Sequence, residues 1–141
     1  MPHCFLPATI FRSRSGQLLR ASQLRRDGGV ELQGLFDTWV SVRRAVRHPP
    51  QERDFVRLRT PRGSFEVTAD HRIVVRGPDG NRVSVEARSL LTDVQHHVCD
   101  GSSFQPVLCA EAYKEAVQVI EVVFEDDQAA VRAWLLPRRR S

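Results

Sequence analysis

The feature of this sequence that most limits its possible folds is a series of short runs in which apolar and polar residues alternate. Each run ends at residues that favour a turn. The pattern is clearest at residues 55–59, where Val56 and Leu58 alternate with arginines. Alternation with a period of two is typical of half-buried β-strands. Residues 60–63, Thr-Pro-Arg-Gly, match a four-residue turn with proline in second place. We therefore predict a β-hairpin whose second strand is residues 64–68.

Similar runs recur along the chain, and no segment is periodic over three helical turns. Residues 43–53 interrupt the pattern with Pro49-Pro50 and many charges, so we expect an exposed loop there. The pattern predicts an all-β fold in a single domain. The further strands are expected at residues 30–32, 38–42, 73–75, 83–85, 95–99, 117–124 and 130–136, and single helical turns at 21–24 and 86–91.

The overall composition is that of an ordinary globular domain. Of the 141 residues, 41% are hydrophobic and 27% are charged, which excludes a disordered chain. No run is long enough to span a membrane. The net charge is +4, and Lys114 is the only lysine among the basic residues. Because the arginines are interspersed with acidic residues, we expect a solvated basic surface and no nucleic-acid partner.

The three cysteines are too few and odd in number for a disulfide-rich framework. Pairing of Cys99 with Cys109 or with Cys4 stays open. Residues 96–99, His-His-Val-Cys, contain metal-ligand types, but their spacing matches no standard zinc motif. Alternating exposure on a strand accounts for the two histidines, so we expect no metal and no cofactor.

Cys4 and the later motif Thr68-Ala69-Asp70-His71 are suited to an attack on the chain's own backbone. A thiolate is a strong nucleophile, and the carbonyl just before Cys4 belongs to His3. Attack would turn this amide into a thioester once an acid protonates the departing amide nitrogen. A histidine is the usual acid near neutral pH, and a hydroxyl on the same turn can hold the peptide or its oxyanion. His71 and Thr68 have this relation.

Four stretches of the sequence, in their order, resemble those of Hint domains, the module shared by hedgehog autoprocessing domains, inteins and bacterial intein-like domains. The first is Cys4-Phe5-Leu6-Pro7-Ala8-Thr9, which is similar to the N-terminal block that begins with the family's cysteine. The second, residues 65–75, carries the Thr-x-x-His motif. The third and fourth are residues 85–101 and 119–124, which resemble the later blocks.

The resemblance implies a horseshoe-shaped all-β fold built from two pseudo-symmetric halves. It places the domain at residues 4–136, with 1–3 as the remnant of an upstream segment and 137–141 as a basic tail. It also implies an N-to-S acyl shift at the bond before Cys4. The substrate would be the chain's own upstream polypeptide, and the acyl acceptor would be water or a small nucleophile.

The resemblance also assigns roles to individual residues. Cys4 is the nucleophile, His71 destabilises the amide and protonates its nitrogen, and Thr68 is the hydrogen-bonding partner. Asp70 is a candidate base for the second step, and the alternative is a turn residue bonded to its own backbone. Asp126 and Asp127 lie in a later acidic turn, where a solvated charge cluster is the simpler interpretation.

Inteins end in His-Asn, whereas this sequence ends in Leu135-Leu136-Pro137 followed by arginines and a serine. We therefore expect cleavage or transfer without splicing, and self-processing rather than turnover of a separate substrate. Two alternatives stay open. One is a cysteine–histidine hydrolase acting on other molecules. The other is a Hint-like β-domain that has lost catalysis and serves as a binding module.

Overall fold

Strands and short 3-10 helices make up the chain in this computed structural model, which describes residues 3–92, 96–126 and 133–138. The prediction of an all-β fold is confirmed. The 3-10 helices are η1 (Ala21–Gln23), η2 (Leu35–Asp37) and η3 (Ala87–Leu91). The strands are β1 (Cys4–Phe5), β2 (Ile10–Arg12), β3 (Leu18–Arg20), β4 (Val30–Gln33), β5 (Trp39–Thr60), β6 (Gly63–Thr68), β7 (Arg72–Arg76), β8 (Arg82–Glu86), β9 (His97–Asp100), β10 (Ser103–Pro106) and β11 (Cys109–Phe124).

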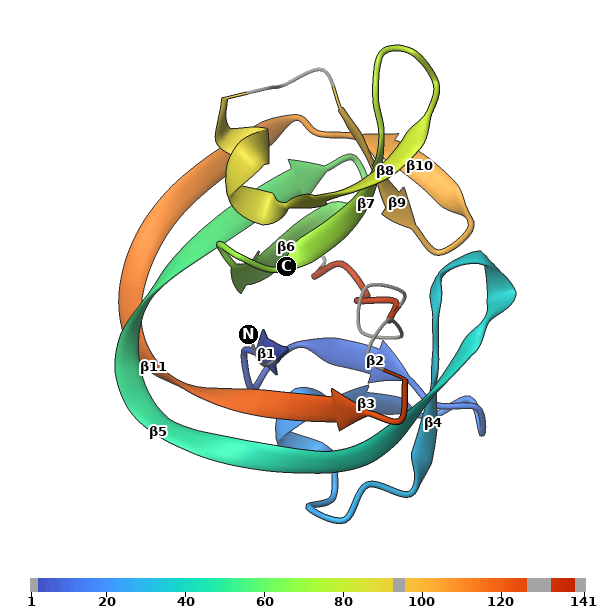
Figure 1. Ribbon diagram of the computed structural model, residues 1–141, viewed down its shortest axis with the longest axis vertical. Coiled ribbons are helices and arrows are strands. Elements are labelled where there is room, and N and C mark those ends of the chain that lie inside the picture. Colours follow the sequence, from blue (N-terminus) through green and yellow to red (C-terminus); the bar gives the residue numbers. More distant parts are fainter. Residues whose placement is uncertain (1–2, 93–95, 127–132, 139–141) are drawn as a thin grey trace.

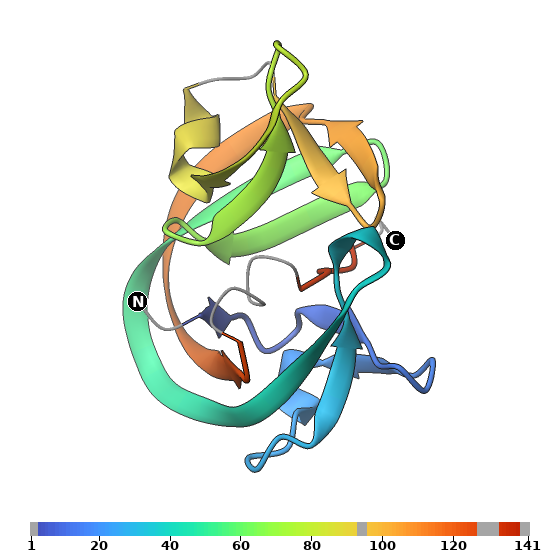
Figure 2. The ribbon, with the colours of Figure 1, turned by 45° about the vertical axis from the view of Figure 1, so that its right-hand side comes forward.

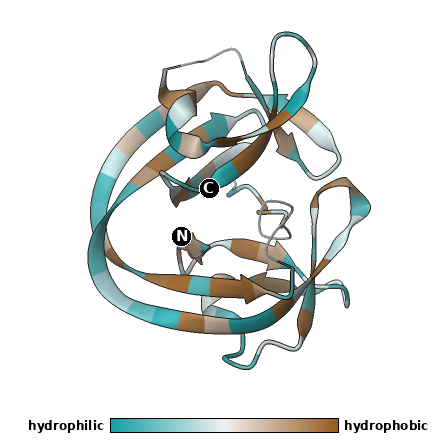
Figure 3. Cartoon of the chain, in the orientation of Figure 1, coloured by the Kyte–Doolittle hydropathy of each residue, from teal (hydrophilic) through white to brown (hydrophobic). Residues whose placement is uncertain are grey.

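Two long antiparallel strands, β5 and β11, form the frame of the molecule. They pair along their length, from Arg59 opposite Cys109 to Val42 opposite Phe124. Figure 1 shows them curving together as an arc, with smaller strands gathered at each end. The middle of this arc is largely hydrophilic, while apolar segments concentrate toward its ends (Figure 3). The arc therefore joins two lobes, and each lobe buries its own apolar side chains.

The expectation of an exposed loop at residues 43–53 is wrong, because this segment lies inside β5. The register with β11 shifts between Val117 and Val119, opposite Gln51 and His48, so Pro49-Pro50 falls at a β-bulge. On the other edge of β5, β4 pairs with one end and β6 with the other. Proline is tolerated at bulges and at unpaired edges, since its missing N–H removes no ladder hydrogen bond there.

The remaining strands complete the two lobes seen from the side in Figure 2. The main sheet has the order β1-β11-β5-β4, with β6 also paired to β5. The predicted hairpin is confirmed, with Thr60 opposite Gly63 and Phe55 opposite Thr68. A second sheet has the order β10-β9-β7-β8, and β2 pairs with β3. Of the expected run at 130–136, residues 130–132 lie outside the described residues, and Leu136 forms an isolated bridge to Ile10.

Each lobe has a separate hydrophobic core. One core includes Phe5, Phe11 and Leu32, and the other includes Val56, Val75 and Leu90. A third, smaller cluster contains Cys4, Phe55 and Val119, all buried. The sequence-predicted nucleophile is thus packed against both strands of the arc. Within the described ranges, no helix is long and apolar enough to cross a membrane.

Candidate active site

Cys4 lies on β1, at the edge of the main sheet, in register with Glu121 on β11. Its side chain is only 4% exposed. The amide N–H of Val122 donates a hydrogen bond to the carbonyl oxygen of His3 at 2.9 Å. The carbonyl that the thiol would attack is therefore held in the strand ladder, with a backbone donor already on its oxygen.

The Thr-x-x-His motif forms the turn between β6 and β7. The amide N–H of His71 donates to the carbonyl oxygen of Thr68 at 3.0 Å, which closes the turn. Ala69 N–H donates to Asp54 on β5 at 2.9 Å, and Ala87 N–H at the start of η3 donates to the His71 carbonyl at 2.8 Å. Backbone hydrogen bonds to β5 and to η3 thus hold the turn that carries the imidazole in place.

These two distant parts of the sequence meet in one open pocket of about 290 Å³. The structure brings together all four sequence-predicted site residues and the residue before the nucleophile. The pocket is lined by His3, Cys4, Thr68, Asp70, His71, Arg72 and Glu86. A bond between His3 and Cys4 therefore has a hydroxyl, a carboxylate and an imidazole around it.

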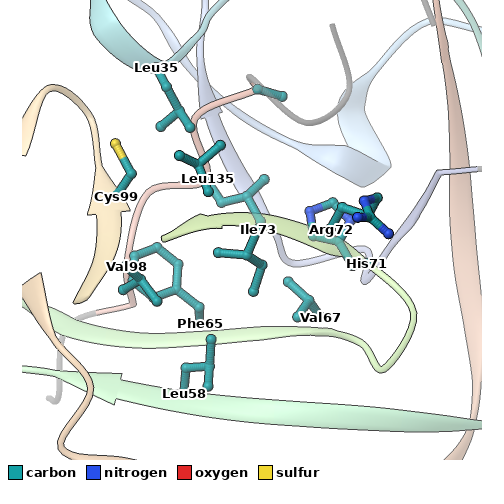
Figure 4. A pocket seen from close by; sticks show the side chains of 12 residues that line it. Leu35, Leu58, Phe65, Val67, His71, Arg72, Ile73, Val98, Cys99 and Leu135 are labelled. Atoms are coloured by element: carbon teal, nitrogen blue, oxygen red, sulfur yellow. The ribbon is translucent and has the colours of Figure 1, made fainter. Parts of the chain in front are cut away.

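His71 is buried, and its surroundings favour the neutral imidazole. Its ring lies edge-on to the ring of Phe5, with the centroids 5.3 Å apart. On another side, it borders an apolar cavity of about 40 Å³ that also touches Val67, Ile73 and Cys99 (Figure 4). Burial first, and then the nearby His3, lower the pKa of His71 to about 4, while Asp70 acts in the opposite direction. At neutral pH the ring is therefore uncharged.

The Cys4 thiol lies in a field of opposing charges. Burial is the main cause that raises its pKa above the ordinary value. The carboxylates of Glu121 and Asp70 raise this pKa further, whereas the guanidinium of Arg53 lowers it. The thiol is therefore protonated in the resting state and needs a proton acceptor before it can attack.

Thr68 and Asp70 both line the pocket. Among the described residues, neither the Thr68 hydroxyl nor the Asp70 carboxylate makes a hydrogen bond to another group. The Thr68 carbonyl, rather than its hydroxyl, closes the turn to His71. The alternative of Asp70 as an Asx-turn residue thus has no hydrogen bond among the described residues to support it.

Glu121 is a site residue that the sequence did not single out. It lies directly across the ladder from Cys4, a position in which side chains share a face with Cβ atoms about 5 Å apart. The Nε2–H of His48 donates to the Glu121 carboxylate at 2.7 Å, and Glu121 is one-fifth exposed. A lone carboxylate inside the apolar run 117–124 is the signal that identifies it, since β-strands rarely bury an unpaired acid.

The other candidates from the sequence lie elsewhere. Asp126 is exposed beyond the end of β11 and does not line the pocket, and Asp127 lies outside the described residues. All three cysteines are free, and the Cys99 thiol donates to the Gly101 carbonyl at 3.5 Å. Among the residues that the structure describes, no three or more His, Cys, Asp or Glu side chains gather as a metal site.

Solved structures with the same architecture are inteins and an intein-like domain. The chain is similar to a mutant of the Ssp DnaB mini-intein variant M86 (TM-score 0.73, 12% identity, 99% of this chain and 96% of that chain). It is also similar to the bacterial intein-like domain from Clostridium thermocellum (0.69, 16%, 98% and 100%). The TvoVMA intein matches with a TM-score of 0.69 at 15% identity, over 89% of each chain.

These likenesses define the class of fold: this is the Hint fold of inteins and intein-like domains. The resemblance seen in the sequence is thereby confirmed for the architecture. No protein-family model matches the chain, and no curated protein matches its sequence.

Proposed function

We propose that the chain is an autoprocessing domain that converts the His3–Cys4 peptide bond into a thioester. The observation that carries this proposal is the single pocket in which His3 and Cys4 meet Thr68, Asp70 and His71. Thr68 lies 64 positions after Cys4 in sequence, and the turn between β6 and β7 brings it to this peptide bond together with Asp70 and His71. The Hint fold of the chain supports the same chemistry.

The reaction begins with transfer of the thiol proton to a base and attack by Cys4 Sγ on the carbonyl carbon of His3. The carbonyl oxygen becomes an oxyanion, and the Val122 N–H already bonds to it. Thr68 also lines the pocket, and we assign its hydroxyl as a second donor to the oxyanion. Preorganised donors of this kind stabilise the charge that develops in the transition state.

The neutral His71 suits a proton shuttle. Because its pKa is lowered to about 4, the imidazole is unprotonated at neutral pH, so its ring nitrogen can take the thiol proton as sulfur bonds to the carbonyl carbon of His3. The imidazolium then donates this proton to the nitrogen of Cys4. The C–N bond breaks, a C–S bond has formed, and the products are a thioester on Cys4 Sγ and its free α-amine. One proton has moved from sulfur to nitrogen, so the step balances.

A second step would release the upstream segment. Water or a small nucleophile attacks the thioester carbonyl, the C–S bond breaks, and the thiolate of Cys4 leaves. Asp70 lines the pocket, and Glu121 lies across the ladder from Cys4. Either carboxylate is placed to take the proton of the attacking nucleophile. We propose cleavage or transfer as the outcome.

The test is a fusion of the full chain behind a well-folded carrier protein. Dithiothreitol or hydroxylamine should release the carrier, and mass spectrometry should place the break between His3 and Cys4. The Cys4→Ala variant should keep its fold and lose all cleavage, while Cys109→Ala, at a partly exposed cysteine, should cleave like the wild type. An inert wild-type fusion would contradict the proposal and favour the binding-module alternative.

A second prediction concerns His71. His71→Ala should slow thiol-induced cleavage by about two to four orders of magnitude, the usual contribution of a positioned acid–base group. His97→Ala, which removes an exposed histidine of β9, serves as the matched control and should leave the rate unchanged. An unaltered rate in His71→Ala would remove this residue from the mechanism.

A further inference from the structure

Arg53 lies on β5 next to the buried cluster that contains Cys4. It lies two residues before Phe55, which belongs to the buried cluster of Cys4 and Val119. Side chains two residues apart on a strand point to the same face of a sheet. Cys4 is paired with Glu121 on β11, so the two side chains lie on the same face of the sheet. Val119 lies two residues before Glu121 and is therefore on this face as well. Arg53 is thus on the face of the sheet that carries the thiol.

The guanidinium of Arg53 is poorly satisfied by the protein. Its Nε atom is buried and makes no hydrogen bond in the part of the chain that the structure describes. One terminal nitrogen, Nη2, donates to the Gln51 side chain at a long 3.5 Å. Glu115 is the direct partner of Arg53 in the ladder, yet the two form no ion pair among the described residues. A half-buried cation left without a carboxylate needs an explanation, because burying its N–H groups costs free energy.

We propose that Arg53 stabilises the ionised thiolate of Cys4 and so makes it available as a nucleophile. This inference rests on Cys4 being the nucleophile of the proposed function. Ionisation moves the thiol proton to solvent and leaves the electron pair on sulfur, on the sheet face that also carries Arg53. No other bond is made or broken in this step.

The charges around the thiol show why such a cation is needed. Burial and the carboxylates of Glu121 and Asp70 all raise the pKa of the Cys4 thiol, whereas Arg53 and, more weakly, the N-terminal amine lower it. The other ionisable groups of the pocket are His3, His71, Arg72 and Glu86, and His48 reaches the site only through its bond to Glu121. In a fusion the N-terminal amine is replaced by a peptide bond, so Arg53 is then the cation that opposes desolvation and the two carboxylates.

The first test follows the ionisation of Cys4 in the intact 141-residue chain. The ultraviolet absorbance of the thiolate is titrated against pH, with the Cys4→Ala protein subtracted. In Arg53→Gln we expect the midpoint to move to higher pH, and in Arg53→Lys, which keeps the charge, to stay near that of the wild type. Arg44→Gln removes the same charge from an exposed site on β5 and is the matched control. Glu121→Gln should move the midpoint to lower pH.

The second test is the pH–rate profile of thiol-induced cleavage in the carrier fusion. Arg53→Gln should be about three- to tenfold slower than the wild type near neutral pH. The two rates should converge at high pH, where both thiols are ionised, and a merely structural defect would not produce this convergence. Circular dichroism checks that each variant is folded.

An unshifted thiolate midpoint in folded Arg53→Gln would overturn the inference, whether or not the fusion cleaves. If the wild-type fusion fails to cleave while the midpoint shifts as expected, the proposed function fails and the electrostatic role of Arg53 stands. Equal slowing at every pH, with an unshifted midpoint, would assign Arg53 to packing alone and would also overturn the inference.

Discussion

His71 separates two very different environments, the open pocket around Cys4 and the dry apolar cavity behind it. This position explains how a histidine in the candidate active site stays uncharged. The apolar side removes water from the ring, and the polar side presents the bond that it would protonate. An imidazole with a lowered pKa is a stronger acid once protonated, which helps it to give a proton to a poorly basic amide nitrogen.

The same burial makes the fold sensitive to acid. The pKa of His71 is about 4 in the folded state and near 6.5 when it is exposed. Between these values the unfolded chain binds more protons, so the stabilising contribution is complete above pH 6.5 and is lost as the pH falls toward 4. The difference between the two pKa values corresponds to about 3 kcal/mol in the free energy of unfolding.

Urea unfolding of the wild type and of His71→Gln at about pH 7.5 and about pH 4.5 checks this prediction. The wild type should lose more stability than His71→Gln between the two pH values. Equal losses would mean that His71 does not couple folding to protonation.

At this scale, the sequence motifs account for part of the candidate pocket. A cysteine near the start and a Thr-x-x-His turn are local motifs, and Cys4, Thr68, Asp70 and His71 do line one pocket. Glu121 and the Val122 N–H depend on how β1 pairs with a strand more than 110 residues later. The register between two such distant strands is set by tertiary packing, so it cannot be predicted from a local sequence pattern.

Among the elements, β5 departs most from its sequence pattern. Its middle carries two prolines and many charges, which in isolation favour a loop. Its ends are ordinary alternating strands, and β11 pairs with the whole length, which carries the pairing across the unfavourable segment. The interpretation as a loop was wrong because proline destabilises a strand only where its missing N–H would have donated a hydrogen bond to the neighbouring strand. At the register shift, Pro49 and Pro50 face no such acceptor.

This account predicts different responses to substitution along the strand. Pro50→Ala should change the free energy of unfolding by no more than about 1 kcal/mol, because no ladder bond is involved. Val56→Pro should destabilise by roughly 3–5 kcal/mol, since Val56 is buried and paired on both sides, with β6 and β11. Chemical denaturation measures both, and similar values for the two variants would contradict the assignment of the bulge.

In the whole molecule, the two lobes have separate cores, and the cluster that contains Cys4 lies on the arc that joins them. Phe55 is fully buried there and stacks on Tyr113 with the ring centroids 5.4 Å apart. The shared cluster of Phe55 with Cys4 means that packing at the junction also positions the thiol. Damage to the junction should therefore affect chemistry more than equal damage within a lobe.

Phe55→Ala and Leu90→Ala test this expectation. Both side chains are buried, and each truncation should cost about 3–5 kcal/mol of stability. At a temperature where both variants remain folded, only Phe55→Ala should slow thiol-induced cleavage strongly. If Leu90→Ala, deep in one lobe, slows cleavage as much, then the site depends on global stability rather than on the junction.

The hydrogen bond from Val122 to the carbonyl of His3 has one more consequence. The acceptor is a main-chain carbonyl, which every amino acid has. Strand β1 pairs along the edge of the main sheet, as an added peptide strand does. We therefore expect the domain to accept many different sequences before Cys4, with residues that resist an extended backbone, proline above all, as the poorest.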